Sequence, residues 1–317
     1  MSIYKILLLS NIVLYPYLVQ AYHLFHYDFP TLNSSIGTHE LNLIDTSRKD
    51  LHDENLAREL PICIWYPAID SRETQFAQWG YTKRDLIFEQ ASNGAPRFIA
   101  EMVYQEQVRS KANLAARTGS YPVVFLFHGL GGGPIEEHTD LAETLTSLGF
   151  IVVGIDFPFG AAISKISQTS KPIAPSKKLT EILSRYPASK PELITYRKEE
   201  HNLWVKDVAF ALKELKARKE LSLSAANWSK VHMIGHSHGG MVALQGCLNE
   251  PSCQSSVNMD GWTYELEFPF DLKRHLVMYT FRVAIIFANS VRIALTVFFG
   301  KLQSAILVIT DFRTTHT

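Results

Sequence analysis

The feature that most constrains the fold is a series of short, strongly apolar segments that alternate with helical patterns. The segments rich in β-branched and aromatic residues are 121–127 (YPVVFLF), 150–158 (FIVVGIDFP) and 230–237 (KVHMIGHS). Runs of this length and composition are typical of strands buried on both faces of a sheet. Between them, residues 140–150 and 195–219 carry apolar side chains at helical spacing. The alternation predicts a mostly parallel sheet with helices on both faces.

Two further segments extend this pattern. Residues 60–68 (LPICIWYPA) and 255–260 (SSVNMD) have the composition of strands. Gly149 is placed to end the helix predicted over residues 140–150. The chain has 317 residues, which suits one large α/β domain or two small ones. We expect a single domain over residues 22–317.

The hexapeptide GHSHGG, residues 235–240, lies at the junction of an apolar strand and a helix. A G-x-S-x-G pattern at such a junction is where a nucleophile elbow forms, with the serine on a sharp, strained turn. Gly235 and Gly239 would let strand and helix approach closely, and the start of the helix favours developing negative charge. We therefore predict that Ser237 is a nucleophile. The alternative is a glycine-rich turn that happens to contain a serine.

The two histidines beside Ser237 are not expected to act as its base. In a tight elbow the neighbouring side chains point away from the serine oxygen, so His236 is predicted to pack or to hydrogen bond. His238 is predicted to donate its backbone N–H to an oxyanion hole. The glycine-rich segment 128–133 (HGLGGG) would supply the second N–H, from Leu130. A plain loop is the alternative, and phosphate binding is disfavoured because no Lys-Ser/Thr pair follows the glycines.

The catalytic acid should follow the serine in the chain, at the end of a strand. Asp260 lies where the segment 255–260 passes into a loop. A carboxylate there would hold the imidazole of a catalytic histidine in the correct tautomer and stabilise its protonated form. The alternative is an ordinary turn aspartate before Gly261.

Five motifs together carry a resemblance to a known family. In their order and spacing, LPICIWYPA, YPVVFLFHGLGGG, GFIVVGID, GHSHGG and VNMDGW resemble the platelet-activating factor acetylhydrolases, the plasma type and its bacterial relatives. The similarity covers roughly residues 36–265, with DTSRKD (45–50) as part of an N-terminal hairpin. It implies an α/β-hydrolase fold and a serine esterase that needs neither calcium nor a cofactor. It also implies short or oxidised acyl chains of phospholipids as substrates, and an acid that matches Asp260.

The C-terminal part departs from that family. Residues 270–317 contain no proline and no glutamate, and all 14 prolines lie at or before Pro269. One interpretation is a shortened ending, with 304–310 (SAILVIT) as the final strand and His316 as the catalytic base. The other is an altered tail in which the true catalytic histidine is lost. His275 is a further candidate, but it is too close to Asp260 to follow two more sheet elements. A membrane span in this tail is disfavoured because basic residues interrupt the apolar run.

The N-terminus has the pattern of an export signal. Lys5 precedes an apolar core that ends in small residues, over positions 1–21. We therefore expect a secreted or periplasmic protein, the alternative being a buried first strand or helix. Export permits disulfides. Cys247 and Cys253 could close a small loop if their side chains are suitably oriented, with two free thiols as the alternative, and Cys63 is expected to be a buried packing residue.

Composition narrows the classes of function. The chain has 31 basic and 31 acidic side chains, so no charge excess indicates a nucleic-acid partner or an anionic membrane surface. No cysteine–histidine cluster indicates a metal site. Two functions remain. The first is an exported esterase that acts on a small-molecule ester or on a phospholipid, the latter with transient contact to a membrane surface. The second is a non-catalytic or truncated hydrolase scaffold that binds a lipid or a protein. Nothing in the sequence indicates the oligomeric state.

Overall fold

The computed structural model describes residues 35–69, 108–185 and 191–261, together with the backbone of strands at 277–281, 294–299 and 306–311. The chain divides into two compact units, Met1–Asn33 and Ser34–Thr317, and only the second contains described residues. The predicted signal segment, His275 and His316 therefore lie outside the described residues.

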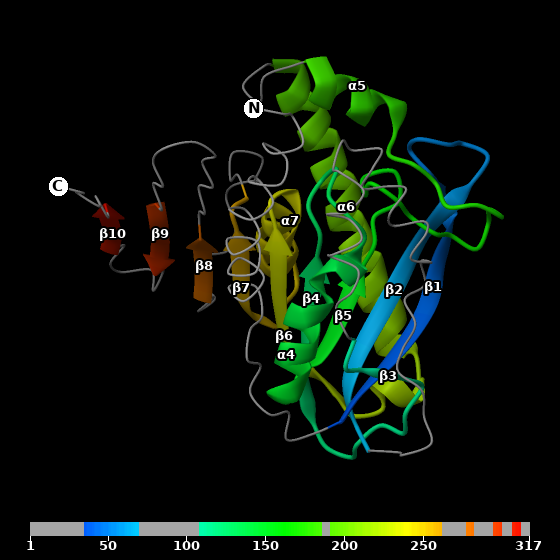
Figure 1. Ribbon diagram of the computed structural model, residues 1–317, viewed down its shortest axis with the longest axis vertical. Coiled ribbons are helices and arrows are strands. Elements are labelled where there is room, and N and C mark those ends of the chain that lie inside the picture. Colours follow the sequence, from blue (N-terminus) through cyan, green and yellow to red (C-terminus); the bar gives the residue numbers. More distant parts are fainter. Residues whose placement is uncertain are drawn as a thin grey trace, which may run out of the picture. The chain divides into compact units, whose positions relative to one another are not determined.

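An eight-stranded sheet in the order β3-β1-β2-β5-β4-β6-β7-β8 forms the centre of the second unit (Figure 1). Its strands are β1 (Ser35–Lys49), β2 (Ala57–Ala68), β3 (Lys111–Ala112), β4 (Tyr121–Phe127), β5 (Ile151–Ile155), β6 (Ala226–His236), β7 (Cys253–Met259) and β8 (Val277–Phe281). From β5 to β8 all neighbours are parallel, whereas β2 is antiparallel to both β1 and β5. The prediction of a mostly parallel sheet is confirmed, and the expected N-terminal hairpin is the β1–β2 pair.

Helices cover both faces of this sheet, as predicted. The helices of the described ranges are η1 (Ile135–His138), α4 (Thr139–Ser147), α5 (Lys177–Arg185), α6 (Pro191–Ala217), η2 (Leu221–Leu223) and α7 (His238–Asn249). Of these, α5 packs on α6 and not on the sheet. Phe125 and Phe127 of β4 belong to one core cluster with residues of α6 and α7. The alternate residues Val124 and Leu126 are equally buried and point to the other face, on the side of η1 and α4. Gly149, with φ of 93°, ends α4 as expected.

The C-terminal strands differ from the expectation of a final strand in the main sheet. The predicted strand at 304–310 is present as β10 (Ile306–Asp311). It pairs antiparallel with β9 (Ala294–Phe299) in a separate two-stranded sheet. The local β-propensity of this apolar segment was correctly recognised, but it pairs with the strand that directly precedes it in the chain instead of joining the main sheet.

A buried ion network ties the β1–β2 hairpin to α6. Arg58 is fully buried and donates to Asp207 (3.0 and 2.6 Å) and to Asp50 (2.8 Å). Arg48 donates to the other oxygen of Asp207 at 2.9 Å and also to Asp45. Burial alone would lower the pKa of Arg58, but the carboxylates of Asp207 and Asp50 raise it. The network therefore holds α6 in register against the sheet edge.

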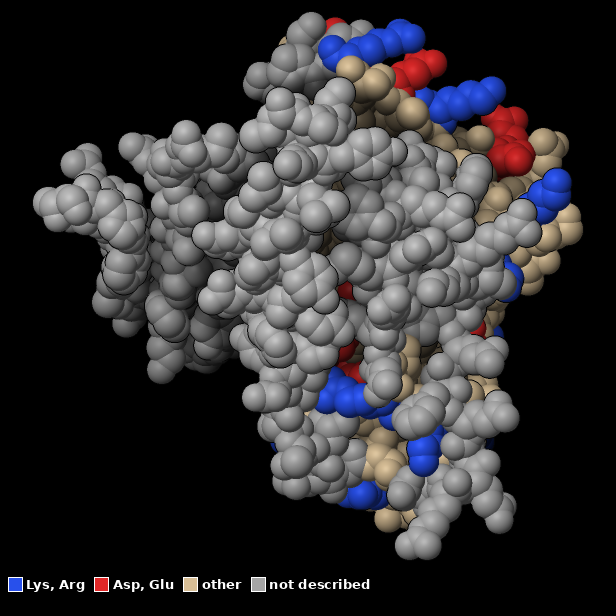
Figure 2. Space-filling model, in the orientation of Figure 1, with Lys and Arg blue, Asp and Glu red and all other residues tan. Residues whose placement is uncertain are grey.

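The described surface carries both signs of charge. Around α5, basic and acidic side chains lie side by side (Figure 2), and Lys178 pairs with Glu199 at 2.7 Å. None of the helices in the described ranges is both long and apolar enough to cross a membrane.

Candidate active site

Ser237 occupies a strained position between a strand and a helix. It follows the last residue of β6 and directly precedes α7, with φ of 52° and ψ of −119°. Non-glycine residues rarely adopt positive φ, and such a conformation costs about 1–3 kcal/mol. The Ser237 N–H donates to the carbonyl of Met259 at 2.8 Å, and the Ser237 carbonyl accepts from the N–H of Gly240 at 3.0 Å. The predicted elbow geometry is therefore present.

The glycines of the motif are sterically required. A Cβ added to Gly235 would overlap the carbonyl oxygen of Gly239. A Cβ added to Gly239 would overlap the carbonyl oxygen of His128 and lie 2.8 Å from that of Phe127. The close approach of strand and helix that was predicted from Gly235 and Gly239 is confirmed, and Gly239 also lies against the end of β4 and the first residue of the glycine-rich loop.

The glycine-rich loop lies against the elbow. A Cβ on Gly129 would lie 3.3 Å from the Cβ of Ser237. The Gly131 N–H donates to the carbonyl of Gly160 at 2.7 Å, which fixes the loop. Within the described part of the chain, neither the N–H of Leu130 nor that of His238 donates to a protein acceptor. Both N–H groups are thus available to donate to an oxyanion.

The side chain of His128 anchors the glycine-rich loop to the end of β5. Its Nδ1–H donates to the carbonyl of Gly129 at 2.9 Å, and its Nε2 accepts the N–H of Phe157 at 3.0 Å. Burial lowers the pKa of His128 to about 4. A neutral imidazole therefore bridges the ends of β4 and β5, and it was not singled out from the sequence.

Asp260 lies at the end of the strand beside the elbow. β6 and β7 pair in parallel, with Gly235 beside Asn258 and His236 beside Met259. The same register continued by one residue brings Ser237 level with Asp260. The Asp260 side chain is exposed, and no residue of the described ranges hydrogen bonds or pairs with its carboxylate.

Asn258 braces this arrangement and was missed in the sequence. Its Oδ1 accepts the N–H of Gly261 at 2.7 Å, and its Nδ2 donates to the carbonyl of Gly261 at 3.1 Å. A Cβ on Gly240 or on Gly261 would collide with Asn258 Oδ1. The sequence carries no clear signal for this role, because the strand CQSSVNM contains three other polar residues and only the structure shows that Asn258 is fully buried.

The two histidines that flank Ser237 have different surroundings. His238 is buried and packs edge-on against Trp204, with ring centroids 4.8 Å apart, and against His201 at 6.1 Å. Burial lowers the pKa of His238 well below its ordinary value. His236 is exposed, and its ring lies 6.2 Å from that of His138. In the described ranges, no histidine is hydrogen bonded to Ser237 or Asp260.

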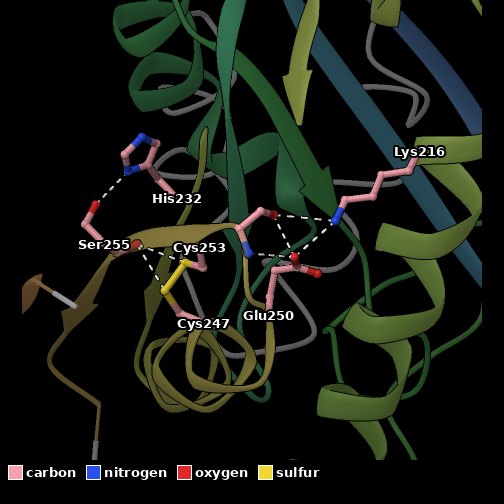
Figure 3. Close-up of a disulfide and its surroundings, with 7 residues drawn as sticks. Lys216, His232, Cys247, Glu250, Cys253 and Ser255 are labelled. Carbon is pink, nitrogen blue, oxygen red and sulfur yellow. Dashed lines mark hydrogen bonds and ion pairs between the residues drawn. A yellow bond between two sulfur atoms is a disulfide. The ribbon is translucent and has the colours of Figure 1, made fainter. Parts of the chain in front are cut away.

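A disulfide joins Cys247 at the end of α7 to Cys253 at the start of β7, with Cα atoms 5.2 Å apart (Figure 3). The same loop is held by an ion pair of 3.1 Å between Lys216 of α6 and Glu250. The predicted pairing is confirmed, and Cys63 is a buried free thiol as expected.

No group of three or more His, Cys, Asp or Glu side chains in the described ranges is arranged to hold a metal ion.

Comparisons with known proteins identify the fold. The family described as "alpha/beta hydrolase fold" matches residues 122–286, more than half of the chain. A ferulic acid esterase from Streptomyces cinnamoneus is 23% identical with a TM-score of 0.61, over 79% of this chain and 66% of that chain. The thermophilic carboxylesterase EstE1 from a metagenomic library is 13% identical, over 71% of this chain and 46% of that chain, and its TM-score of 0.33 supports no inference. This chain thus spans less than two thirds of the length of either protein. From the family match and the observed sheet order, the chain belongs to the α/β-hydrolase fold family.

Proposed function

We propose that this chain is a serine hydrolase of carboxylic esters. The observation that carries the proposal is Ser237 in a strained turn at the start of α7, with the glycine-rich loop against it. Such a turn exposes the serine oxygen and places it at the positive end of a helix. Gly129 lies against the Ser237 side chain, and Gly240 and Gly261 lie against its carbonyl oxygen. These contacts support a conformation whose strain a turn without chemistry would not need.

The proposed reaction proceeds through an acyl-enzyme. Ser237 Oγ attacks the acyl carbonyl, and its proton passes to a histidine that Asp260 orients. The N–H groups of Leu130 and His238 stabilise the oxyanion. The histidine then protonates the leaving alcohol, and water releases the acid and restores the serine. We propose His316 as this histidine, on the strength of its position after Asp260 in the chain.

The substrate class is a finer proposal. The resemblance to the platelet-activating factor acetylhydrolases favours short or oxidised acyl esters of phospholipids, reached by transient contact with a lipid surface. The same resemblance and the signal-like N-terminus favour export, to the periplasm or outside the cell. The Cys247–Cys253 disulfide supports an oxidising compartment.

The alternative is a hydrolase scaffold without catalysis. It is favoured by one observation: the Asp260 carboxylate has no partner within the described ranges, although the acid of a working triad holds a histidine.

Turnover of a short-chain nitrophenyl ester tests the proposal. Ser237→Ala should reduce kcat/KM by roughly 10⁴-fold or more, with an unchanged melting curve. Ser224→Ala, at an exposed serine, is the control and should retain full activity. His316→Ala should remove most of the turnover, whereas His236→Ala should not. Retained activity in Ser237→Ala would exclude this serine as the nucleophile, and an inactive wild type would favour the non-catalytic scaffold.

A further inference from the structure

Leu183 of α5 is an apolar side chain that lies beside the glycine-rich loop and is half exposed. In the same helix, Leu179 and Ile182 are buried. Leu183 follows Leu179 by four residues, so helical geometry places both on the same side of α5, yet Leu183 is 51% exposed. A Cβ added to Gly131 would lie 3.0 Å from a terminal methyl group of Leu183. The inward side of α5 therefore continues past its buried residues to the loop that carries Leu130.

Hydrogen bonds from two neighbouring residues hold α5 beside this loop. The Phe159 carbonyl accepts the N–H of Ser176 at 2.9 Å, and Ser176 Oγ caps the start of α5 by accepting the N–H of Leu179 at 3.1 Å. The adjacent Gly160 carbonyl accepts the N–H of Gly131 at 2.7 Å. Because consecutive residues anchor the helix and the loop, the two are held in a fixed relation to each other.

The side chain of Leu130 belongs to the same arrangement. It packs against the apolar cluster that α5 forms with the first turns of α6, which comprises Leu179, Ile182, Leu193 and Tyr196. The backbone N–H of Leu130 is also a candidate donor to the oxyanion. One residue thus gives an N–H to the proposed oxyanion hole and an apolar side chain to the α5 cluster, so an ester bound at this N–H lies close to apolar surface.

The order of the strands decides which part of the ester lies on this side. β6, which ends just before Ser237, lies between β4 and β7 in the sheet. The glycine-rich loop follows β4, whereas Asp260 follows β7. In the proposed reaction the histidine that Asp260 orients protonates the departing alcohol, so the alcohol lies on the β7 side. The acyl chain then extends to the β4 side, where Leu183 contacts the loop.

We propose that Leu183 is a specificity-determining residue whose side chain contacts the acyl chain of the ester beyond the acetyl carbons. This inference rests on the proposed function and adds to it the residue that sets the preferred chain length. Contact between a half-exposed leucine and an acyl chain removes apolar surface of both from water, which favours chains long enough to reach the leucine. An acetyl group ends close to Ser237 and gains little from this contact.

Hydrolysis of the nitrophenyl esters of acetate, butanoate and hexanoate tests the proposal, because the alcohol is the same in each. Leu183→Ala should lower kcat/KM for the hexanoate by about fivefold or more, and kcat/KM for the acetate by less than about twofold. Leu183→Met keeps an apolar side chain of similar volume and should keep the wild-type preference. Leu221→Ala, at an exposed leucine of η2, is the control and should match the wild type. Melting curves check that each variant is folded.

A second series, in which acetate esters differ only in their alcohol, tests the assignment of sides. Leu183→Ala should leave the preference among alcohols unchanged. A changed preference among alcohols, or an acyl-chain preference in Leu183→Ala equal to that of the wild type, would overturn this inference while Ser237 keeps its proposed role. If the wild-type chain hydrolyses no ester of either series, the proposed function fails and this inference fails with it.

Discussion

At the scale of single residues, the candidate site depends on glycines, whose lack of a Cβ atom allows close backbone contacts. Ser237 can hold a positive φ because Gly235, Gly239 and Gly240 leave room for carbonyl and amide oxygens that a Cβ would displace. Asn258 then fills part of that room and fixes the turn that carries Asp260. Ser237 and the candidate acid Asp260 are thus positioned by the same small set of contacts.

Gly239→Ala tests this steric requirement. The new methyl group would collide with the backbone oxygens of His128 and Phe127, which cannot move without shifting β4 and the glycine-rich loop. We expect a loss of about 2–4 kcal/mol in the free energy of unfolding and a loss of ester turnover. Gly246→Ala in the same helix is the control, since its methyl group would meet mainly the flexible Met233 side chain. Similar unfolding curves for the two variants would show that the close approach at Gly239 is unimportant.

At the scale of secondary-structure elements, α6 connects the edge of the sheet to the elbow. Asp207 fastens this helix to Arg58 and Arg48. One turn earlier, Trp204 packs against the ring of His238. The ion network can therefore influence the residue that follows the candidate nucleophile, although neither arginine contacts it.

Asp207→Asn should destabilise the fold by about 3–5 kcal/mol, because the charge of fully buried Arg58 would lose its main counterion. Chemical denaturation measures this change. Glu199→Gln breaks the exposed pair with Lys178 and should cost less than about 1 kcal/mol. A loss for Asp207→Asn no larger than that of the control would mean that the network contributes little.

The elements could be predicted from the sequence because their signals are local. The apolar runs that became β4, β5 and β6 and the spacing that became α6 are contained in windows of a few turns or strands. The Arg58–Asp207 pair joins residues 149 positions apart, so no local window contains it. The strained turn at Ser237 and the Cys247–Cys253 pair could be predicted because each motif spans only a few residues. The catalytic roles of Ser237 and Asp260 stay predictions.

At the scale of the whole molecule, buried neutral histidines make the fold sensitive to acid. Burial lowers the pKa values of His128, His138 and His201 from 6.5 to about 4, and that of His238 well below 6.5. Between about pH 6.5 and 4 these histidines are protonated in the unfolded chain but neutral in the folded chain. The free energy of unfolding therefore falls as the pH falls through this window. Each histidine contributes at most on the order of 1.4 kcal/mol per pH unit. Glu136, whose pKa is raised, acts in the opposite direction but is a single group.

Urea unfolding at about pH 7 and about pH 5 should show this loss, and His201→Phe should reduce the pH dependence because it removes one of the titrating groups. A free energy of unfolding that is constant between the two pH values would contradict the account of the buried histidines.

The central claim, that Ser237 is an activated nucleophile, is tested most directly by covalent labelling with a fluorophosphonate probe followed by peptide mapping. We predict a single labelled serine, Ser237, with labelling abolished in Ser237→Ala and after denaturation, and retained in Ser224→Ala. Labelling at another serine, or none at Ser237 in the folded wild-type chain, would contradict the claim.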